Sequence, residues 1–381
     1  MVQYKLRIIA TTAFGMEAVC KREMQKLGYS ELFVENGRIE IDGTFEDVVR
    51  LNLWLRTAER IKIKIGTFKA ETFTELFDET KKLEWGKIIP KGGAFPVDAK
   101  SVKSKLFSLS DCQKIVKKAI VEKLKEERKE DWLDESGALY RFEVSLLNDI
   151  AEITLDTSGA GLHKRGYRKL IGFAPIKETM AAAMIDLSYW NKERILLDPM
   201  CGSGTFPIEA ALIARNIAPG LNRKFSAEKW ENFDQSIWQK EKVAAKKLID
   251  YDTELKLYGY DYDPEVIEIA KINADDAGVL EDVNFESKDF LKLGKLPWEY
   301  GVMITNPPYG ERIDKRDEAI QIYKKFGQIM EENPTWSYYL LTSNEDFEGA
   351  AGKKSDRKRK LFNGNIKVDY YQYYGPRPPK E

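Results

Sequence analysis

The sequence predicts an α/β fold that is divided over two or three domains. Three observations predict it: the length of 381 residues, the alternation of strand and helix patterns from residue 176 to the C-terminus, and a different order of elements in the first 68 residues. Alternating strands and helices are typical of a doubly wound sheet. The chain is longer than one average domain, so we expect separate hydrophobic cores.

The first 68 residues show the order strand, helix, strand, strand, helix, strand. The Asn36-Gly37 pair between two short apolar stretches is a strong signal for a β-hairpin. This βαββαβ order is the ferredoxin-like arrangement. The predicted strands are residues 4–10, 31–35, 38–42 and 59–68, and the predicted helices are residues 15–28 and 45–56.

A second unit with many lysines covers residues 69–157. Its predicted helices are residues 73–85 and 111–129, and its predicted strands are residues 94–100, 139–147 and 150–156. Seven lysines stand between residues 81 and 105, against only Glu84 and Asp98. Such a face is either simply solvated or a platform that follows the phosphates of a nucleic acid. The sequence leaves both interpretations open.

A glycine-rich connector, residues 158–175, leads to the C-terminal half and holds four basic residues and no acid. A helical pattern at 176–190 and an apolar strand at 194–199 follow, and strands and helices then alternate. Residues 364–375 read as the terminal hairpin strand of the sheet. Residues 216–254 are an insertion for which the sequence indicates no purpose.

A tight glycine turn joins the strand at 194–199 to an apolar helix. Gly202 and Gly204 let the backbone turn sharply beside a ligand. A dinucleotide-binding turn would need a third glycine where this sequence has Pro207, so a nicotinamide cofactor is disfavoured. The form Asp198-x-x-x-Gly-x-Gly instead resembles motif I of class I S-adenosylmethionine-dependent methyltransferases.

Acidic residues follow the next two predicted strands. Asp261 ends a short apolar stretch, and a carboxylate at that place can accept hydrogen bonds from both ribose hydroxyls. Asp263 stands where the next helix begins, so we assign helix capping to Asp263 and ribose binding to Asp261. Asp289 can accept from the exocyclic amine of adenine, with Phe290 beside the ring. A plain surface acid is the equal alternative for Asp289.

Residues 306–309 read Asn-Pro-Pro-Tyr and directly follow an apolar strand. Two prolines hold a short backbone segment stiff and leave its carbonyl groups free to accept. The side-chain oxygen of Asn306 and the carbonyl oxygen of Pro307 are therefore matched acceptors for the two hydrogens of a nucleobase amine. Acceptors fixed in this way aim the nitrogen lone pair at a methyl donor and stabilise the developing positive charge. Tyr309 would stack on the unstacked base.

Residues 198–204 and 306–309 together resemble the amino-methyltransferases of nucleic acids, whose motif IV reads Asp, Asn or Ser followed by Pro-Pro-Tyr. With the N-terminal order, the lysine-rich unit and residues 161–185, the chain resembles the THUMP-domain RNA guanine-N2 methyltransferases over essentially its whole length. The resemblance implies a ferredoxin-like domain at 1–68, a THUMP domain at 69–157 and a Rossmann-like class I methyltransferase domain at 158–381.

The resemblance also implies an activity and a site. The expected reaction is methyl transfer from S-adenosyl-L-methionine to the N2 amine of a guanine in 23S ribosomal RNA. The expected catalytic residues are Asn306, Pro307, Pro308 and Tyr309, with Glu311 and Arg312 extending the motif. The expected cofactor-binding residues are Lys177, Glu178, Thr179, Asp198, Pro199, Cys201, Gly202, Ser203, Gly204, Thr205, Asp261, Tyr262, Asp289, Phe290 and Asn306. The expected RNA-binding residues are Lys100, Lys103, Lys105, Arg165, Tyr167, Arg168, Lys354, Arg357 and Arg359.

Three alternatives stay open for the function. A tRNA guanine-N2 methyltransferase would share every motif. A DNA adenine-N6 methylase shares motif IV but does not need the N-terminal half. A non-catalytic RNA-binding assembly factor could retain the fold, although the intact Asn-Pro-Pro-Tyr sequence argues against it.

The amino-acid composition limits the possible binding partners and the cellular location. Lys and Arg total 61 against 62 Asp and Glu, so overall charge excludes no partner; the basic run at 353–360 is either a solvated loop or a phosphate clamp. Three separated cysteines and a single histidine disfavour a disulfide framework and a zinc site. No signal peptide and no apolar run of about 20 residues is apparent. We expect a cytoplasmic protein without a metal or membrane partner. The oligomeric state stays open, and a monomer is plausible.

Overall fold

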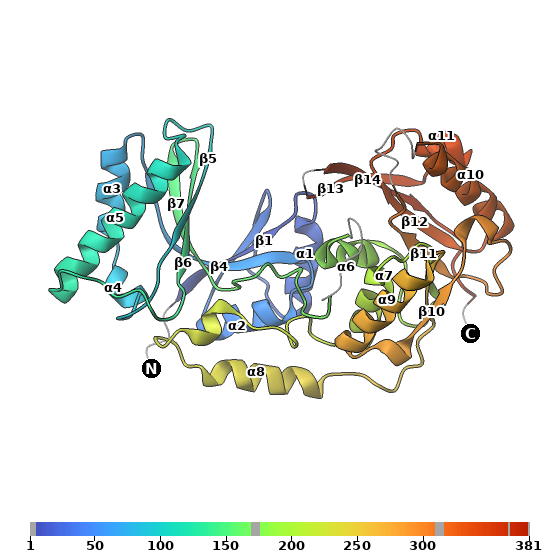
Figure 1. Cartoon of the computed structure of the whole chain (residues 1–381), viewed down its shortest axis with the longest axis horizontal. Coiled ribbons are helices and arrows are strands. Elements are labelled where there is room, and N and C mark those ends of the chain that lie inside the picture. The colour runs from blue at the N-terminus through green and yellow to red at the C-terminus, as the bar shows by residue number, and fades with distance from the viewer. Residues whose placement is uncertain (1–4, 169–175, 309–315, 365, 380–381) are drawn as a thin grey trace. The chain divides into compact units, whose positions relative to one another are not determined.

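The computed structural model describes residues 5–168, 176–308, 316–364 and 366–379. The chain forms two compact units. Unit 1 contains residues 1–12, 24–162 and 224–244, and unit 2 contains residues 13–23, 163–223 and 245–381. Each unit is built on one sheet of seven strands (Figure 1). Two helices contain residues assigned to both units: α1 (Glu17–Lys26) and α8 (Ser236–Lys247).

Unit 1 has the strand order β2-β3-β1-β4-β7-β6-β5. Its strands are β1 (Leu6–Thr12), β2 (Phe33–Glu35), β3 (Arg38–Gly43), β4 (Ala58–Lys69), β5 (Val97–Val102), β6 (Arg141–Leu147) and β7 (Ile150–Asp156). Its helices are α2 (Phe45–Trp54), α3 (Phe73–Lys81), α4 (Trp85–Ile88) and α5 (Leu109–Arg128), with the 3-10 turn η1 (Ser226–Lys229). The antiparallel order β2-β3-β1-β4 confirms the predicted ferredoxin-like arrangement.

Strand β4 joins the two parts of this sheet. It pairs with β1 along one edge and with β7 along the other, so the ferredoxin-like strands and the following strands form one continuous sheet. The single helix predicted at 73–85 was wrong, because the helix ends at Lys81 and a short helix α4 follows. Trp85 is buried and its indole N–H donates to the carbonyl of Thr80, which turns the chain into the core at this point.

The middle of the predicted insertion belongs to unit 1. Trp230 is fully buried, stacks on Tyr140 with ring centroids 5.0 Å apart, and donates its indole N–H to the carbonyl of Leu139. Phe233 stacks on Phe45 at 4.0 Å. Residues 224–244 therefore supply aromatic side chains to the core of a unit that is otherwise built from the first 162 residues.

Replacing Trp230 by Ala should lower the stability of unit 1. We expect a loss of about 3–5 kcal/mol in the free energy of unfolding, because a buried indole and its hydrogen bond are both removed. The matched control is Trp132→Ala, since Trp132 is 81% exposed in the same unit and should change stability by less than about 0.5 kcal/mol. Denaturant unfolding followed by circular dichroism measures both, and equal effects of the two variants would contradict the packing described.

Unit 2 has the strand order β10-β9-β8-β11-β12-β14-β13. Its strands are β8 (Leu196–Asp198), β9 (Leu257–Asp261), β10 (Val283–Ser287), β11 (Val302–Thr305), β12 (Ser337–Thr342), β13 (Arg357–Asn363) and β14 (Ile366–Tyr373). Its helices are α6 (Glu178–Leu187), α7 (Thr205–Ala214), α9 (Pro264–Ala277), α10 (Arg316–Glu332) and α11 (Phe347–Ala351), with the 3-10 turns η2 (Leu280–Asp282) and η3 (Phe290–Lys292). The first five strands in this order are parallel, and β14 is antiparallel to β12 and β13.

The central strands of unit 2 are apolar on both sides, as expected for a doubly wound sheet. Leu196 and Leu197 point into different cores, one shared with helices α6, α7 and α9 and the other shared with α10 and α11. Val302 and Met303 of β11 alternate in the same way. The strand order reverses between β8 and β11, and ligands bind at the carboxyl ends of strands at such a switch point.

Candidate active site

The turn between β8 and α7 holds two glycines in the left-handed region that disfavours side chains. Gly202 has φ +53° and Gly204 has φ +84°. A Cβ atom on Gly202 would meet nothing within 4 Å, whereas one on Gly204 would lie 3.1 Å from Ala270 and from Phe285. The two glycines therefore have different tasks. Gly202 leaves space for a ligand, and Gly204 lets the turn pack closely on α9 and β10.

Asp261 ends β9 directly beside this turn. One carboxylate oxygen accepts the Gly202 N–H at 3.0 Å and the other accepts the Asp263 N–H at 3.2 Å. Burial raises the pKa of Asp261 above its usual range. Asp263 accepts the N–H of Glu265 and caps α9, as predicted. Each oxygen of Asp261 keeps a second lone pair with which it can accept from a ligand hydroxyl.

Asp289 and Phe290 follow β10 on the same edge of the sheet. Asp289 accepts the N–H of Leu291 at 3.0 Å, which fixes the short turn η3. Phe290 is 4% exposed and packs on Phe326 of α10 at 4.9 Å. These residues form an apolar wall with one acceptor at its edge, which suits a flat heteroaromatic ring.

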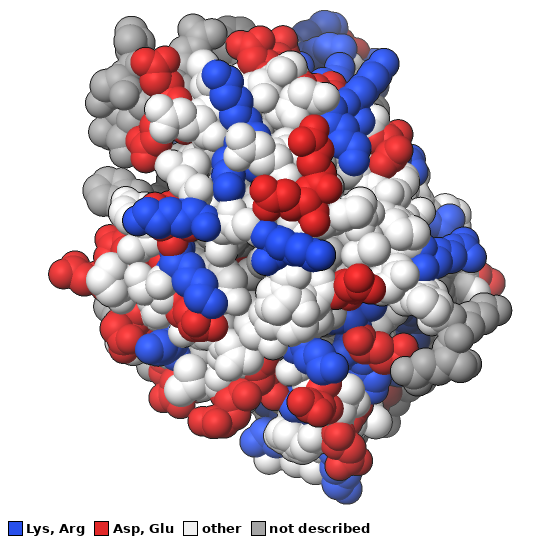
Figure 2. Space-filling model, turned by 90° about the vertical axis from the view of Figure 1, so that its right-hand side faces the viewer, with Lys and Arg blue, Asp and Glu red and all other residues white. Residues whose placement is uncertain are grey.

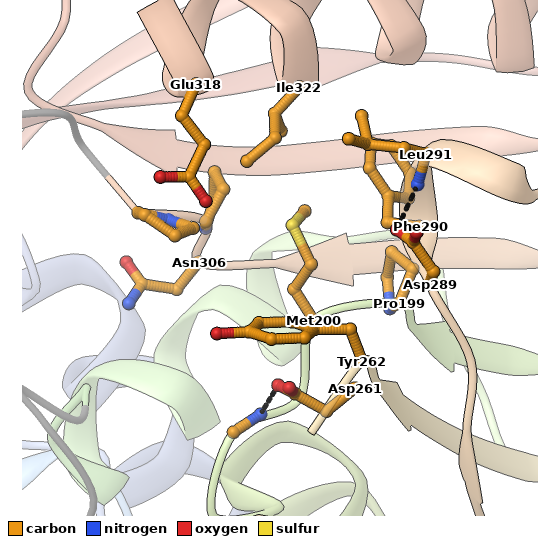
Figure 3. Close-up of a pocket in the computed structure, with 13 residues that line it drawn as sticks. Pro199, Met200, Asp261, Tyr262, Asp289, Phe290, Leu291, Asn306, Glu318 and Ile322 are labelled. Carbon is orange, nitrogen blue, oxygen red and sulfur yellow. Dashed lines mark hydrogen bonds between the residues drawn. The ribbon is translucent and has the colours of Figure 1, made fainter. Parts of the chain in front are cut away.

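Asn306, Pro307 and Pro308 follow β11 and lie opposite the glycine turn. Together with Pro199, Met200, Gly202, Asp261, Tyr262, Asp289, Phe290, Leu291, Glu318 and Ile322 they line one cavity of about 580 Å³. Cavities of roughly 300–1,000 Å³ are typical of small-molecule sites. In Figure 3 the amide of Asn306 points to the side of the cavity away from Asp289 and Phe290. Tyr309, Glu311 and Arg312 lie outside the described residues.

Several predicted cofactor residues do not line this cavity. Asp198 is 2% exposed under the turn, where it accepts the Met200 N–H at 3.2 Å, and burial raises its pKa to about 7. Thr205 is buried at the start of α7, where its hydroxyl accepts from Arg168. The others that do not line it are Lys177, Glu178, Thr179, Cys201, Ser203 and Gly204. A direct ligand contact by these residues remains a prediction.

Two predicted RNA contacts proved to be interior residues. Arg165 and Tyr167 are 3% and 2% exposed, and both bond to the carboxylate of Glu209, which is itself fully buried. Arg168 donates to the carbonyl of Ile176 and lies 3.5 Å from Glu178. The prediction that Arg165 and Tyr167 face RNA was therefore wrong, whereas an RNA contact by the partly buried Arg168 stays a prediction. Their polar groups hold the starts of α6 and α7 in place.

The remaining predicted RNA contacts are mostly at the surface. Lys100 pairs with Glu143 at 2.9 Å and Lys105 pairs with Glu71, and both lysine side chains remain exposed. Lys103, Lys354 and Arg357 are exposed, and Arg359 is half-buried.

The basic run at 353–360 was left open as a solvated loop or a phosphate clamp. Its second half belongs to strand β13, which pairs with β14. Figure 2 shows Lys and Arg side chains interspersed with Asp and Glu on the face in view. Among the residues that Figure 2 draws in colour, positive and negative charges are therefore mixed.

Four lining residues were missed by the sequence interpretation: Met200, Leu291, Glu318 and Ile322. Met200 and Leu291 stand beside predicted residues and could have been found from that position. Glu318 and Ile322 lie on α10, and only the path of the chain after β11 brings them to the cavity. Among the described residues, no three His, Cys, Asp or Glu side chains gather as a metal-binding cluster, and no helix is long and apolar enough to cross a bilayer.

The fold and the site define a class I methyltransferase domain behind a ferredoxin-like and a THUMP domain. Sequence profiles agree: the RlmL ferredoxin-like domain matches residues 7–62, the THUMP domain residues 70–156 and the RMKL-like methyltransferase domain residues 165–372. The chain belongs to the RMKL-like methyltransferase family.

Individual relatives align over the whole chain. "Putative RNA methyltransferase YpsC" of Bacillus subtilis (strain 168) is 50% identical, with 99% of this chain and 98% of that protein covered. The crystal structure of a "predicted N6-adenine-specific DNA methylase" from Listeria monocytogenes is 48% identical, with a TM-score of 0.93 over 98% of this chain and 97% of that one. The structure of SMU.472, "a putative methyltransferase complexed with SAH", is 44% identical with a TM-score of 0.93 over 100% of both chains.

Proposed function

We propose that this protein transfers a methyl group from S-adenosyl-L-methionine to the exocyclic N2 amine of a guanine in structured RNA, with 23S ribosomal RNA as the substrate. The observation that carries the proposal is that the stiff acceptor segment at 306–308 and the glycine turn at 202 line one cavity. A cofactor held by the turn and an amine held by the segment would meet inside it.

The residues present fit the proposed cofactor. Gly202 leaves open space above the turn, Asp261 offers two acceptor oxygens for ribose hydroxyls, and Phe290 offers a flat apolar surface for adenine. Tyr262 is 75% exposed, and its aromatic ring lies beside Asp261 at the cavity (Figure 3). The relative SMU.472 was crystallised with S-adenosylhomocysteine, the product form of this cofactor.

The cofactor supplies a methyl group that its sulfonium already activates, so this chain has to position the amine. Asn306 and the carbonyl of Pro307 accept the two amine hydrogens and favour a pyramidal nitrogen, whose lone pair then faces the cofactor. The amine is uncharged before the transfer and cationic during it, so both acceptors bind it more tightly in the transition state. We propose that Tyr309 stacks on the flipped base.

RNA as the substrate rests on the N-terminal half. The THUMP domain profile and the naming of YpsC as an RNA methyltransferase both support it. We propose the domain division 1–68, 69–157 and 158–381, and phosphate contacts by Lys100, Lys103, Lys105, Lys354, Arg357 and Arg359. We also propose the cytoplasm as its location, since Cys20, Cys112 and Cys201 form no disulfide bond in the described part of the chain.

Cofactor binding should weaken in acid. Burial raises the pKa of Asp198 to about 7, so lowering the pH from about 8 to about 6 protonates it. This removes a negative charge beneath the glycine turn, which we propose holds the methionine end of the cofactor. We expect the affinity for S-adenosylmethionine, measured by calorimetry, to fall about 3- to 10-fold over this range. The Asp198→Asn variant should show a flatter profile. An affinity that rises on acidification would contradict the assignment.

Nucleoside mass spectrometry tests the function. Ribosomal RNA, tRNA and DNA are compared between a deletion strain and the same strain carrying the gene. The proposal expects N2-methylguanosine in 23S ribosomal RNA to depend on the gene. A gene-dependent N2-methylguanosine in tRNA would make tRNA the substrate. A gene-dependent N6-methyladenine in DNA, the activity predicted for the Listeria monocytogenes protein, would overturn the proposal.

A further inference from the structure

Guanine differs from the other amine-bearing bases at the ring nitrogen beside its amine. The carbon that bears the guanine amine lies between two ring nitrogens: N3, which accepts, and N1, which carries a hydrogen and donates. In adenine and cytosine the ring nitrogen beside the amine has a lone pair and accepts. A flipped base is read through hydrogen bonds to this edge. An acceptor fixed next to Asn306 would therefore select guanine, and a donor there would select adenine or cytosine.

Glu318 stands at this place. It lies in the first turn of α10 and lines the cavity together with Asn306, Pro307 and Pro308. Figure 3 shows its carboxylate pointing from the helix toward the Asn306 end of the cavity, away from Asp289 and Phe290. An ionised carboxylate accepts through both oxygens and cannot donate.

The other two acids of the cavity already have structural tasks. Asp261 accepts two backbone N–H groups, and Asp289 accepts the N–H of Leu291. The carboxylate of Glu318 makes no hydrogen bond or ion pair with any residue in the described part of the chain. Among the acids that line this cavity, Glu318 is thus the one whose carboxylate no described residue engages.

We propose that Glu318 determines the specificity for guanine by accepting the N1–H of the target base while Asn306 and Pro307 accept from its N2 amine. This inference rests on the proposed function and deepens it. Adenine or cytosine in the same position would turn a ring lone pair toward the carboxylate. The carboxylate and the ring nitrogen would then be two acceptors facing each other with no hydrogen between them. In a site with little water, this arrangement costs much binding free energy.

The discriminating substrate is 2-aminopurine, which keeps the amine of guanine but has a lone pair in place of the N1–H. Two synthetic RNAs spanning the mapped guanosine, one with guanine and one with 2-aminopurine at the target, are compared by kcat/KM. We expect the wild-type protein to prefer guanine by about 100-fold or more. Glu318→Gln should narrow the preference to about 10-fold or less, because an amide can donate to the ring nitrogen as well as accept.

Two controls separate specificity from general damage. Asp317→Asn removes the neighbouring exposed acid, which does not line the cavity, and should leave both rates unchanged. The affinity of Glu318→Gln for S-adenosylhomocysteine, measured by calorimetry, should stay within about twofold of the wild type.

An unchanged ratio between guanine and 2-aminopurine in Glu318→Gln would overturn the inference while guanine methylation still supports the proposed function. A loss of cofactor affinity in that variant would also overturn it, because Glu318 would then serve the cofactor. If nucleoside mapping finds a modified adenine or cytosine and no modified guanine, both the proposed function and this inference fail.

Discussion

Asn306→Ala should lower the turnover number about 100- to 1,000-fold while the dissociation constant of S-adenosylmethionine changes by less than about threefold. The side chain supplies one of two acceptors that bind the amine more tightly as it becomes cationic. Its removal therefore weakens binding of the transition state more than it weakens binding of the ground state. The cofactor's adenosine end would lie at Asp261 and Phe290, on the other side of the cavity, and should bind as before.

Asn306→Asp is the matched variant for this experiment. A carboxylate keeps an acceptor oxygen in the same place, and the resembled motif IV includes Asp at this position. We expect Asn306→Asp to retain more activity than Asn306→Ala, with thermal unfolding of both variants close to that of the wild type. Equal losses of turnover and of cofactor affinity in Asn306→Ala would count against the role of an amine acceptor.

Gly202→Ala should abolish most cofactor binding, with a loss of affinity of about 100-fold or more. Its Cβ would project into open space that belongs to the cavity, and the backbone there has φ +53°, which side chains disfavour. Stability should fall only by about 1–2 kcal/mol, since no neighbouring atom of the protein is displaced.

Gly278→Ala provides the control for backbone strain. Gly278 ends α9 with φ +74°, and a Cβ there would also meet nothing within 4 Å, but Gly278 does not line the cavity. The two variants should lose similar stability, measured by denaturant unfolding, and only Gly202→Ala should lose the cofactor, measured by calorimetry. Retention of full affinity by Gly202→Ala would contradict the placement of the ligand above this turn.

The parts of the site that depend on local backbone chemistry could be predicted from the sequence. Gly202, Asp261 and the segment at 306–308 stand at the ends of predicted strands, and in a parallel sheet such ends meet on one edge. The two residue types also predict the backbone conformation directly, because glycine can adopt positive φ values and proline restricts φ. The sequence alone was therefore sufficient to predict that these residues lie close together.

The parts that depend on distant partners could not be predicted. Arg165 and Tyr167 look solvated in a basic connector, and only the fold brings Glu209, more than 40 residues away, into contact with them. The insertion at 216–254 showed no purpose in the sequence, because the burial of its aromatic side chains depends on Tyr140 and Phe45 in another part of the chain. Glu318 was missed for the same reason. Its helix α10 comes after the Asn-Pro-Pro-Tyr motif in the sequence, and only the fold shows that this helix lines the cavity.

The most direct test of the account is to locate the methyl group that the purified protein transfers. The protein is incubated with S-adenosylmethionine labelled in its methyl group and with ribosomal RNA from the deletion strain, and the labelled nucleosides are then identified by mass spectrometry. The account predicts label on the N2 nitrogen of guanosine and nearly none with Asn306→Ala. Label on a ribose oxygen, on a ring carbon or on adenine, or equal labelling by the wild type and Asn306→Ala, would contradict it.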